Sequence, residues 1–104
     1  MPKKYSLRYL PLFEQDLAEA RDYIANILHN PVAAQRLIDD TDKEIINRLG
    51  NNPSAFEPHH SAKDRKHPYY PIRIKNYTVF YVLIDNVMEI RRFVYSKRDI
   101  SKLL

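Results

Sequence analysis

The chain contains no cysteine and no tryptophan, and its 104 residues include a single glycine. Without cysteine the protein forms no disulfide and offers no thiolate to a metal ion, a composition that fits a reducing cytoplasm. It also lacks an apolar run long enough to cross a bilayer, and no signal-peptide pattern precedes its first expected strand. We therefore expect a cytoplasmic protein with no membrane partner, folded as one domain over residues 1–104.

Positive charge is in excess, and it is unevenly distributed along the chain. The net charge is +4. Residues 12–50 carry eight acidic and four basic side chains, whereas the rest of the chain carries thirteen basic and five acidic ones. Such a concentration of positive charge favours a polyanionic partner, either nucleic acid or an acidic protein segment. The alternative is an ordinary solvated surface, which is what most charge runs form.

Three short runs rich in β-branched and aromatic residues dominate the C-terminal third of the chain. They span residues 69–74, 77–84 and 87–95 and are separated by the pairs Lys75-Asn76 and Asp85-Asn86. Two-residue breaks between such runs predict tight hairpins, with the asparagine of each pair in place of the usual glycine. The runs therefore predict an antiparallel three-stranded meander, and something else must cover one of its faces.

The region before the meander predicts a strand and two helices that supply this cover. Residues 3–10 alternate between apolar and polar side chains, which predicts a first strand. Apolar residues then recur at three- and four-residue steps over residues 12–29 and 31–49, which predicts two amphipathic helices. Asn30 as N-cap and Pro31 as first helical residue separate them, so the helices fold back on each other.

The expected end of the second helix completes the fold prediction. We expect Gly50 to take the left-handed conformation that closes many helices, and the following Asn51-Asn52-Pro53 to prevent continuation. The whole pattern predicts an α+β fold in the order β-α-α-β-β-β. A helical hairpin is packed on a four-stranded, mainly antiparallel sheet.

A long loop over residues 51–68 joins the helices to the meander and concentrates histidines and cations. These residues are His59, His60, His67, Lys63, Arg65 and Lys66. Two adjacent histidines rarely bind one ion, and no acidic cluster accompanies them, so we expect neither a metal nor another cofactor. We interpret the segment as a cationic loop that leads into the sheet.

The order of elements and two of the predicted strands resemble the RelE/ParE superfamily, the toxins of bacterial type II toxin–antitoxin modules. The resemblance covers essentially the whole chain. One strand begins N-Y-T-V-F-Y, and the last reads I-R-R-F-V-Y-S-K-R-D, where the family often reads I-x-R-hydrophobic-hydrophobic-H/Y-G-x-R-D. The matching residues are Ile90, Arg92, Tyr95, Arg98 and Asp99, with Ser96 where glycine is common.

The resemblance implies a toxin with a cognate antitoxin that carries an acidic, amphipathic segment. RelE-like members cut mRNA in the ribosomal A site without a metal, whereas ParE-like members poison DNA gyrase. The leading expectation is ribosome-dependent mRNA cleavage, with the ribosome and mRNA as partners. The alternatives are a non-enzymatic gyrase inhibitor and an inactive toxin that retains only antitoxin binding, because a shared fold does not fix the activity.

The resemblance also supplies candidate site residues for mRNA cleavage. Arg98 resembles the arginine that follows the last strand of the ribonucleases, and Arg73 falls near a basic residue of their second strand. Arginine stays charged and grips phosphate oxygens in two places. Tyr95 or His67 would carry a proton or stack on a base. The cations expected to bind nucleic acid are Lys63, Arg65, Lys66, Lys75, Arg92 and Lys97.

Some features weigh against catalysis or have structural explanations. Thr78 stands where the ribonucleases often have arginine, and the chain ends in Leu103-Leu104 where several of them carry tyrosine. Arg98 is as well explained by an ion pair with Asp99. One of the neighbours Arg91 and Arg92 is expected to face solvent or to pair with Glu89 or Asp85. Tyr77 and Tyr81 share a face, which favours cross-strand packing.

Overall fold

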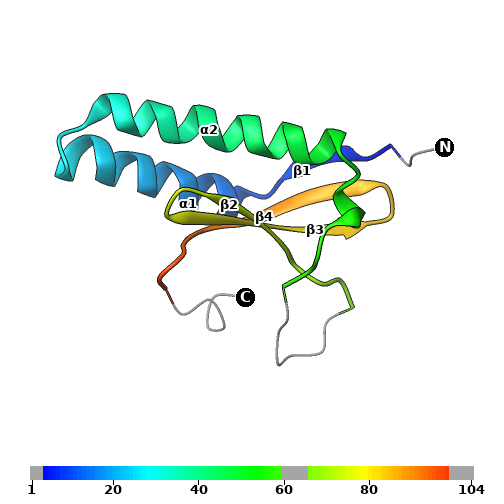
Figure 1. Ribbon diagram of the computed structural model, residues 1–104. Helices are drawn as coiled ribbons and strands as arrows, with labels where there is room; N and C mark the ends of the chain where they lie inside the picture. The colour runs from blue at the N-terminus through cyan, green and yellow to red at the C-terminus, as the bar shows by residue number, and fades with distance from the viewer. Residues whose placement is uncertain (1–3, 60–65, 99–104) are drawn as a thin grey trace.

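The computed structural model describes residues 4–59 and 66–98, which form one helical layer on one sheet. The elements are β1 (Ser6–Tyr9), α1 (Pro11–Asp22), the π-turn η1 (Tyr23–Ile27), α2 (Pro31–Gly50), the 3-10 turn η2 (Pro53–Ala55), β2 (Tyr70–Ile74), β3 (Tyr77–Ile84) and β4 (Val87–Tyr95). The strand order is β1-β4-β3-β2, and β1 runs parallel to β4 while the other pairs are antiparallel. Figure 1 shows α1 and α2 side by side over one face of the sheet. The predicted α+β fold is confirmed.

The meander forms with two-residue turns, as predicted. However, the residue with positive φ in each turn is the first one. Lys75 and Asp85 both have a φ of 55°, and neither Asn76 nor Asn86 has a positive φ. A lysine therefore occupies a conformation that favours glycine or asparagine, at a steric cost that the flanking strands must offset.

The helical hairpin has the predicted start of its second helix but a different end to its first. Asn30 caps α2 by accepting a hydrogen bond from the Ala33 amide at 3.1 Å, and Pro31 is the first helical residue. The first helix was expected to run to His29. Instead α1 ends at Asp22 and continues as the π-turn, and no described helix has the length and hydropathy needed to span a bilayer.

The prediction that Gly50 closes α2 in the left-handed conformation is wrong. Gly50 is the last residue of the helix and has no positive φ. The left-handed residue is Asn52, with a φ of 55°, two positions later. Asparagine tolerates this conformation because its short polar side chain bonds locally, here by accepting from Ser54 Oγ at 2.8 Å.

The main core lies between the helices and the sheet. The predicted stripe on α2 is buried at Leu37 and Ile45, and Phe13 of α1 is 2% exposed. They pack with Ile72, Ile74, Val79, Tyr81, Met88, Ile90 and Phe93 of the strands. Thr41 is also fully buried, and its hydroxyl donates to the Leu37 carbonyl at 2.7 Å. That bond satisfies its polar atom inside the core.

A smaller cluster lies on the opposite face of the sheet, around Phe80. Tyr69, Val82 and Val94 pack with it, and the His59 ring meets the Phe80 ring edge-on at 5.6 Å. The His59 amide donates to the Tyr69 carbonyl at 2.6 Å, which ties the middle of the long loop to the residue before β2. The sheet is therefore buried on both faces, by the helices on one and by this loop on the other.

Candidate functional site

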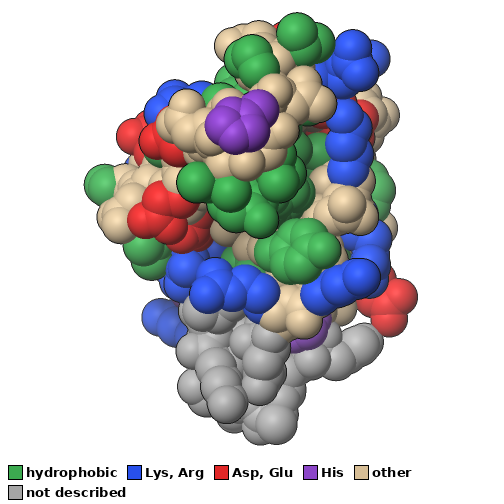
Figure 2. Space-filling view, turned by 90° about the vertical axis from the view of Figure 1, so that its left-hand side faces the viewer, with side chains coloured by type: hydrophobic (Ala, Val, Ile, Leu, Met, Phe, Trp, Pro, Cys, Tyr) green, Lys and Arg blue, Asp and Glu red, His purple; other side chains and the backbone are tan. Residues whose placement is uncertain are grey.

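A groove with a volume of about 810 Å³ opens between the helical layer and one end of the sheet. We call it the aromatic groove. Its lining residues are Asp16, Glu19, Ala20, Tyr23, Ile24, Leu28, Asn76, Tyr77, Phe93, Tyr95 and Arg98. Figure 2 looks at this end of the molecule, where hydrophobic side chains gather between acidic side chains on the left and a band of Lys and Arg below.

The helical wall of the groove is shaped by the π-turn. The Leu28 amide donates to the Tyr23 carbonyl, five residues back, at 3.1 Å, so the turn holds one residue more than an α-helical turn. Such turns are rare and are frequent at functional sites. His29 then takes a φ of 52°, and the Asn30 amide closes the turn on the Ile24 carbonyl at 3.0 Å. Tyr23 and Leu28 are left more than half exposed beside the groove.

Three aromatic side chains from the paired ends of β3 and β4 form the floor of the groove. Tyr77 stacks on Phe93 with 4.8 Å between ring centroids, and Tyr95 meets Tyr77 edge-on at 5.5 Å. Burial raises the pKa of Tyr77, and the nearby Tyr95 and Tyr23 add to this. Tyr77 is therefore a neutral phenol at physiological pH and forms part of the packing, as its position on the core face indicated.

One carboxylate fixes the position of β4 against α1 at the edge of the groove. The β3–β4 register shifts between Phe80 and Tyr81, which is a β-bulge. Asp16 accepts the Phe93 amide at 3.1 Å and also binds Arg92, whose Nε lies 2.8 Å away. The side chains of Asp16 and Arg92 are only 11% and 19% exposed. Arg92, predicted to bind nucleic acid, is thus held in a shielded ion pair.

The structure brings two of the predicted catalytic residues together and places a third elsewhere. Arg98 is exposed, its amide donates to the Tyr95 carbonyl at 3.0 Å, and both residues line the aromatic groove. Arg73 is exposed on β2 between Ile72 and Ile74, whose side chains enter the core under the helices. Because successive side chains of a strand alternate, Arg73 projects from the opposite face of the sheet.

The remaining predicted cations are dispersed. Lys75 Nζ lies 3.2 Å from Asp40 of α2, and Lys97 is exposed in the turn after β4. Lys66 is exposed and His67 half-buried in the segment that precedes β2. Lys63, Arg65, His60 and Asp99 lie outside the described residues. Within residues 4–59 and 66–98, no group of three or more His, Asp or Glu side chains is arranged to hold a metal ion.

Sequence reasoning offered Glu89 as a partner for one of the two β4 arginines, but it did not find Arg8 or Tyr69 in the charged network on the opposite face of the sheet. Glu89 is 5% exposed and accepts hydrogen bonds from Arg8 Nε at 2.8 Å and Arg91 Nε at 2.9 Å. Arg91 also donates to the Tyr69 hydroxyl at 3.4 Å. Burial acts to raise the pKa of Glu89, but the hydrogen bonds from the two arginines outweigh it and lower that pKa. We call Arg8, Glu89, Arg91 and Tyr69 the Glu89 network.

Comparison with known proteins places this architecture among toxins. A family model described as the ParE toxin of the type II toxin–antitoxin system parDE matches residues 7–100. A structure of the chromosomal ParDE system from P. aeruginosa is 13% identical with a TM-score of 0.71, over 91% of this chain and 99% of that chain. No curated protein sequence matches.

Two structures of the E. coli DinJ-YafQ toxin–antitoxin complex are also similar. They are 13% and 14% identical, each has a TM-score of 0.52, and each match covers 88% of this chain and 92% of theirs. At these identities the structural likeness shows the fold. The family match extends from β1 through β4 and so includes both walls of the aromatic groove. The chain therefore belongs to the ParE family, the toxins of type II toxin–antitoxin systems.

Proposed function

We propose that this toxin acts by binding a protein surface, with DNA gyrase as its target, and that it does not depend on RNA cleavage. The observation that carries this proposal is the charge balance of the aromatic groove. Asp16 is neutralised by Arg92, which leaves Glu19 opposed to Arg98 among the charged residues of the lining. A groove without surplus positive charge offers little stabilisation to a phosphate that gains negative charge in the transition state.

The distribution of the other cations supports the same proposal. Metal-independent cleavage of RNA requires cations and a proton carrier within reach of one phosphate. Arg98 and Tyr95 share the groove, but Arg73 projects from the opposite face, and Thr78 is buried where the ribonucleases often have arginine. Within the described residues, a single guanidinium is thus available beside Tyr95.

We propose that the antitoxin inhibits the toxin by occupying the aromatic groove. Tyr77 and Phe93 form an apolar floor that suits the anchors of an amphipathic helix, and Arg98 at the margin suits an acidic residue of that helix. Glu19 on the other wall suits a basic one. A segment with an apolar stripe and charges of both signs therefore fits this groove better than a wholly acidic segment.

The target is tested with purified toxin in two assays run side by side. In a supercoiling assay with gyrase and plasmid DNA, we expect inhibition together with DNA breaks that remain attached to the enzyme. In primer extension on cellular mRNA after brief expression, we expect no new 5′ ends within codons. New 5′ ends without any effect on gyrase would refute the gyrase proposal.

Ribosome-dependent mRNA cleavage is the second candidate, and one observation favours it. The predicted transition-state arginine, Arg98, and the predicted proton carrier, Tyr95, are adjacent at the same groove. On this hypothesis Arg98→Ala should reduce cleavage about a hundredfold, and Arg98→Lys should restore part of it. A toxin silent in both assays that still binds its antitoxin would be the inactive form.

A further inference from the structure

A second groove, with a volume of about 460 Å³, lies along a neighbouring face of α1. We call it the outer groove, and it is lined by Tyr9, Phe13, Glu14, Leu17, Asp42 and Ile46. These residues come from the end of β1, from α1 and from the second half of α2. The aromatic groove uses other residues of α1, so the two grooves share no side chain.

The floor of the outer groove is apolar and partly aromatic. Phe13 is 2% exposed, and the Tyr9 ring lies over it with 5.6 Å between centroids. Ile46 is 55% exposed at the rim, whereas its neighbour Ile45 and Leu37 on the same helix are buried in the core. An aliphatic side chain from another molecule would therefore find a hydrophobic contact here at little cost in desolvation.

Two exposed carboxylates, those of Glu14 and Asp42, stand at the rim of this floor. In the part of the chain that the structure describes, no hydrogen bond or ion pair joins either carboxylate, or the Tyr9 hydroxyl, to another side chain. After burial, which is the largest cause, the charges of Asp42 and Glu14 raise the pKa of Tyr9. Their negative potential thus acts directly on the aromatic floor.

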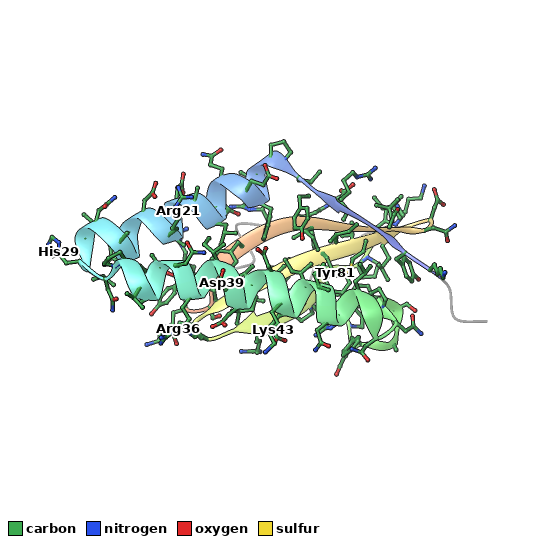
Figure 3. All side chains as sticks on the ribbon, turned by 90° about the horizontal axis from the view of Figure 1, so that it is seen from above. Arg21, His29, Arg36, Asp39, Lys43 and Tyr81 are labelled. Carbon is green, nitrogen blue, oxygen red and sulfur yellow. The ribbon has the colours of Figure 1, made fainter. Side chains whose placement is uncertain are left out.

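Two basic residues of α2 lie away from the outer groove. In Figure 3, which looks down on the two helices, Arg36 and Lys43 lie along the edge of α2 away from α1. Asp42 and Ile46 line the seam between the helices. Carboxylates at this seam repel phosphates, so neither nucleic acid nor an anionic membrane fits the outer groove.

We propose that the outer groove binds a protein segment that presents an arginine beside a leucine-like side chain. A guanidinium over the half-buried Tyr9 ring gains a cation–π contact and pairs with Glu14 and Asp42. The neighbouring aliphatic side chain then packs on Leu17 and Ile46. This inference depends on neither the gyrase proposal nor the antitoxin in the aromatic groove.

The proposal is tested by NMR titration of the isotopically labelled full chain with the peptide Ac-Leu-Arg-NH2. Ac-Leu-Gln-NH2 is the matched neutral peptide. We expect arginine-dependent shift changes centred on the side chains of Phe13, Leu17 and Ile46. The double variant Glu14→Gln/Asp42→Asn should bind the arginine peptide about three- to tenfold more weakly, as expected for the loss of two exposed ion pairs.

Asp39→Asn is the matched control, because it removes one carboxylate from α2 outside the outer groove. It should change the affinity less than twofold. All three acidic residues are exposed, so these variants keep the fold. Equal shifts with the glutamine peptide, shifts centred elsewhere, no saturable shifts, or full affinity in the double variant would each overturn the proposal.

Discussion

Arg91 and Arg92 are consecutive residues of β4, yet they serve opposite faces of the sheet. Arg92 turns toward the helices and pairs with Asp16 at the edge of the aromatic groove. Arg91 turns to the other face and joins Arg8 on the buried Glu89. The first pair holds one helix to one strand, whereas the second holds two parallel neighbouring strands and the Tyr69 side chain.

The comparison shows how the protein disposes of charge on a sheet that is buried on both faces. Glu89 pairs with both Arg8 and Arg91, so one negative charge faces two positive ones. The Glu89 network therefore carries a net positive charge, and its two arginines are partly exposed. Asp16 accepts hydrogen bonds from one arginine and one backbone amide. Its charge is thereby balanced, and the floor of the aromatic groove consists of aromatic rings. Strongly shielded pairs stabilise structure mainly when both partners stay in place, since the loss of either leaves the other uncompensated.

The largest expected effect follows from breaking the pair on the helical face. Asp16→Ala removes the carboxylate that pairs with Arg92 and accepts the Phe93 amide in a shielded position. We expect it to lower the free energy of unfolding by about 3 kcal/mol, measured by urea denaturation. Glu19→Ala, an exposed acid one turn later on α1, should cost less than about 0.5 kcal/mol. Equal losses for the two variants would show that Asp16 is not an anchor.

The network on the opposite face should give a smaller effect with a distinct pH dependence. Glu89→Gln should cost about 2 kcal/mol at pH 7, because a neutral amide accepts weaker bonds from Arg8 and Arg91. The pKa of Glu89 is below its ordinary value of 4.5 in the folded protein. Its contribution to stability is therefore complete above about pH 4.5 and is lost as the pH falls through the lower folded pKa.

Denaturation curves of the wild type and Glu89→Gln between pH 3 and pH 7 measure this contribution. The difference in stability between the two proteins should shrink as the solution is acidified. A difference that stays constant down to pH 3 would mean that the two arginines do not depend on the charge of Glu89.

Arg98 of the aromatic groove is exposed, so we expect it to matter for binding and not for stability, unlike the Asp16–Arg92 pair and the Glu89 network. Arg98→Ala should leave the free energy of unfolding unchanged within about 0.5 kcal/mol, because no described partner is lost. It should weaken antitoxin binding by about 1 kcal/mol and make the association rate less sensitive to salt. Stopped-flow association at several ionic strengths tests this, with Arg21→Ala on α1 as the control for a lost surface charge. An unaltered salt slope would exclude Arg98 from electrostatic steering.

The smallest expected change in stability is at Gly50, which belongs to neither the Asp16–Arg92 pair nor the Glu89 network. Gly50 has a helical conformation, and no heavy atom lies within 4 Å of a Cβ built on it. Gly50→Ala should therefore stabilise the protein by about 0.5–1 kcal/mol without altering either pair. A lower melting temperature would mean that the position requires glycine after all.

Local signals in the sequence were sufficient for much of the fold. The Asn30-Pro31 start of α2 was predicted because an N-cap depends on the residues within one turn. The placement of Arg73 also follows from alternation with its apolar neighbours on β2. The failure at Gly50 has a local cause as well, since Asn52 takes the left-handed conformation instead and the helix includes the glycine.

The limits of α1 and the partners of the β4 arginines could not be predicted in this way. The helical pattern continued to His29, but α1 ends at Asp22 and a π-turn over Tyr23–Ile27 adds one residue to the turn. Glu89 was foreseen as a partner for one of the two arginines. Asp16, which lies 76 positions before Arg92, was not, because nothing in either segment indicates that they meet.

The sequence by itself determined the order of the elements, the hairpin turns and the adjacency of Tyr95 and Arg98, which are three residues apart. The tertiary structure decided which charged side chains form ion pairs within the fold and which remain exposed for a partner. Alternation along β4 turns Arg92 toward Asp16 and its neighbour Arg91 toward Glu89. The β-bulge, where the β3–β4 register shifts between Phe80 and Tyr81, then reverses this alternation because it adds one residue to β4, so Phe93 faces the helices together with Arg92.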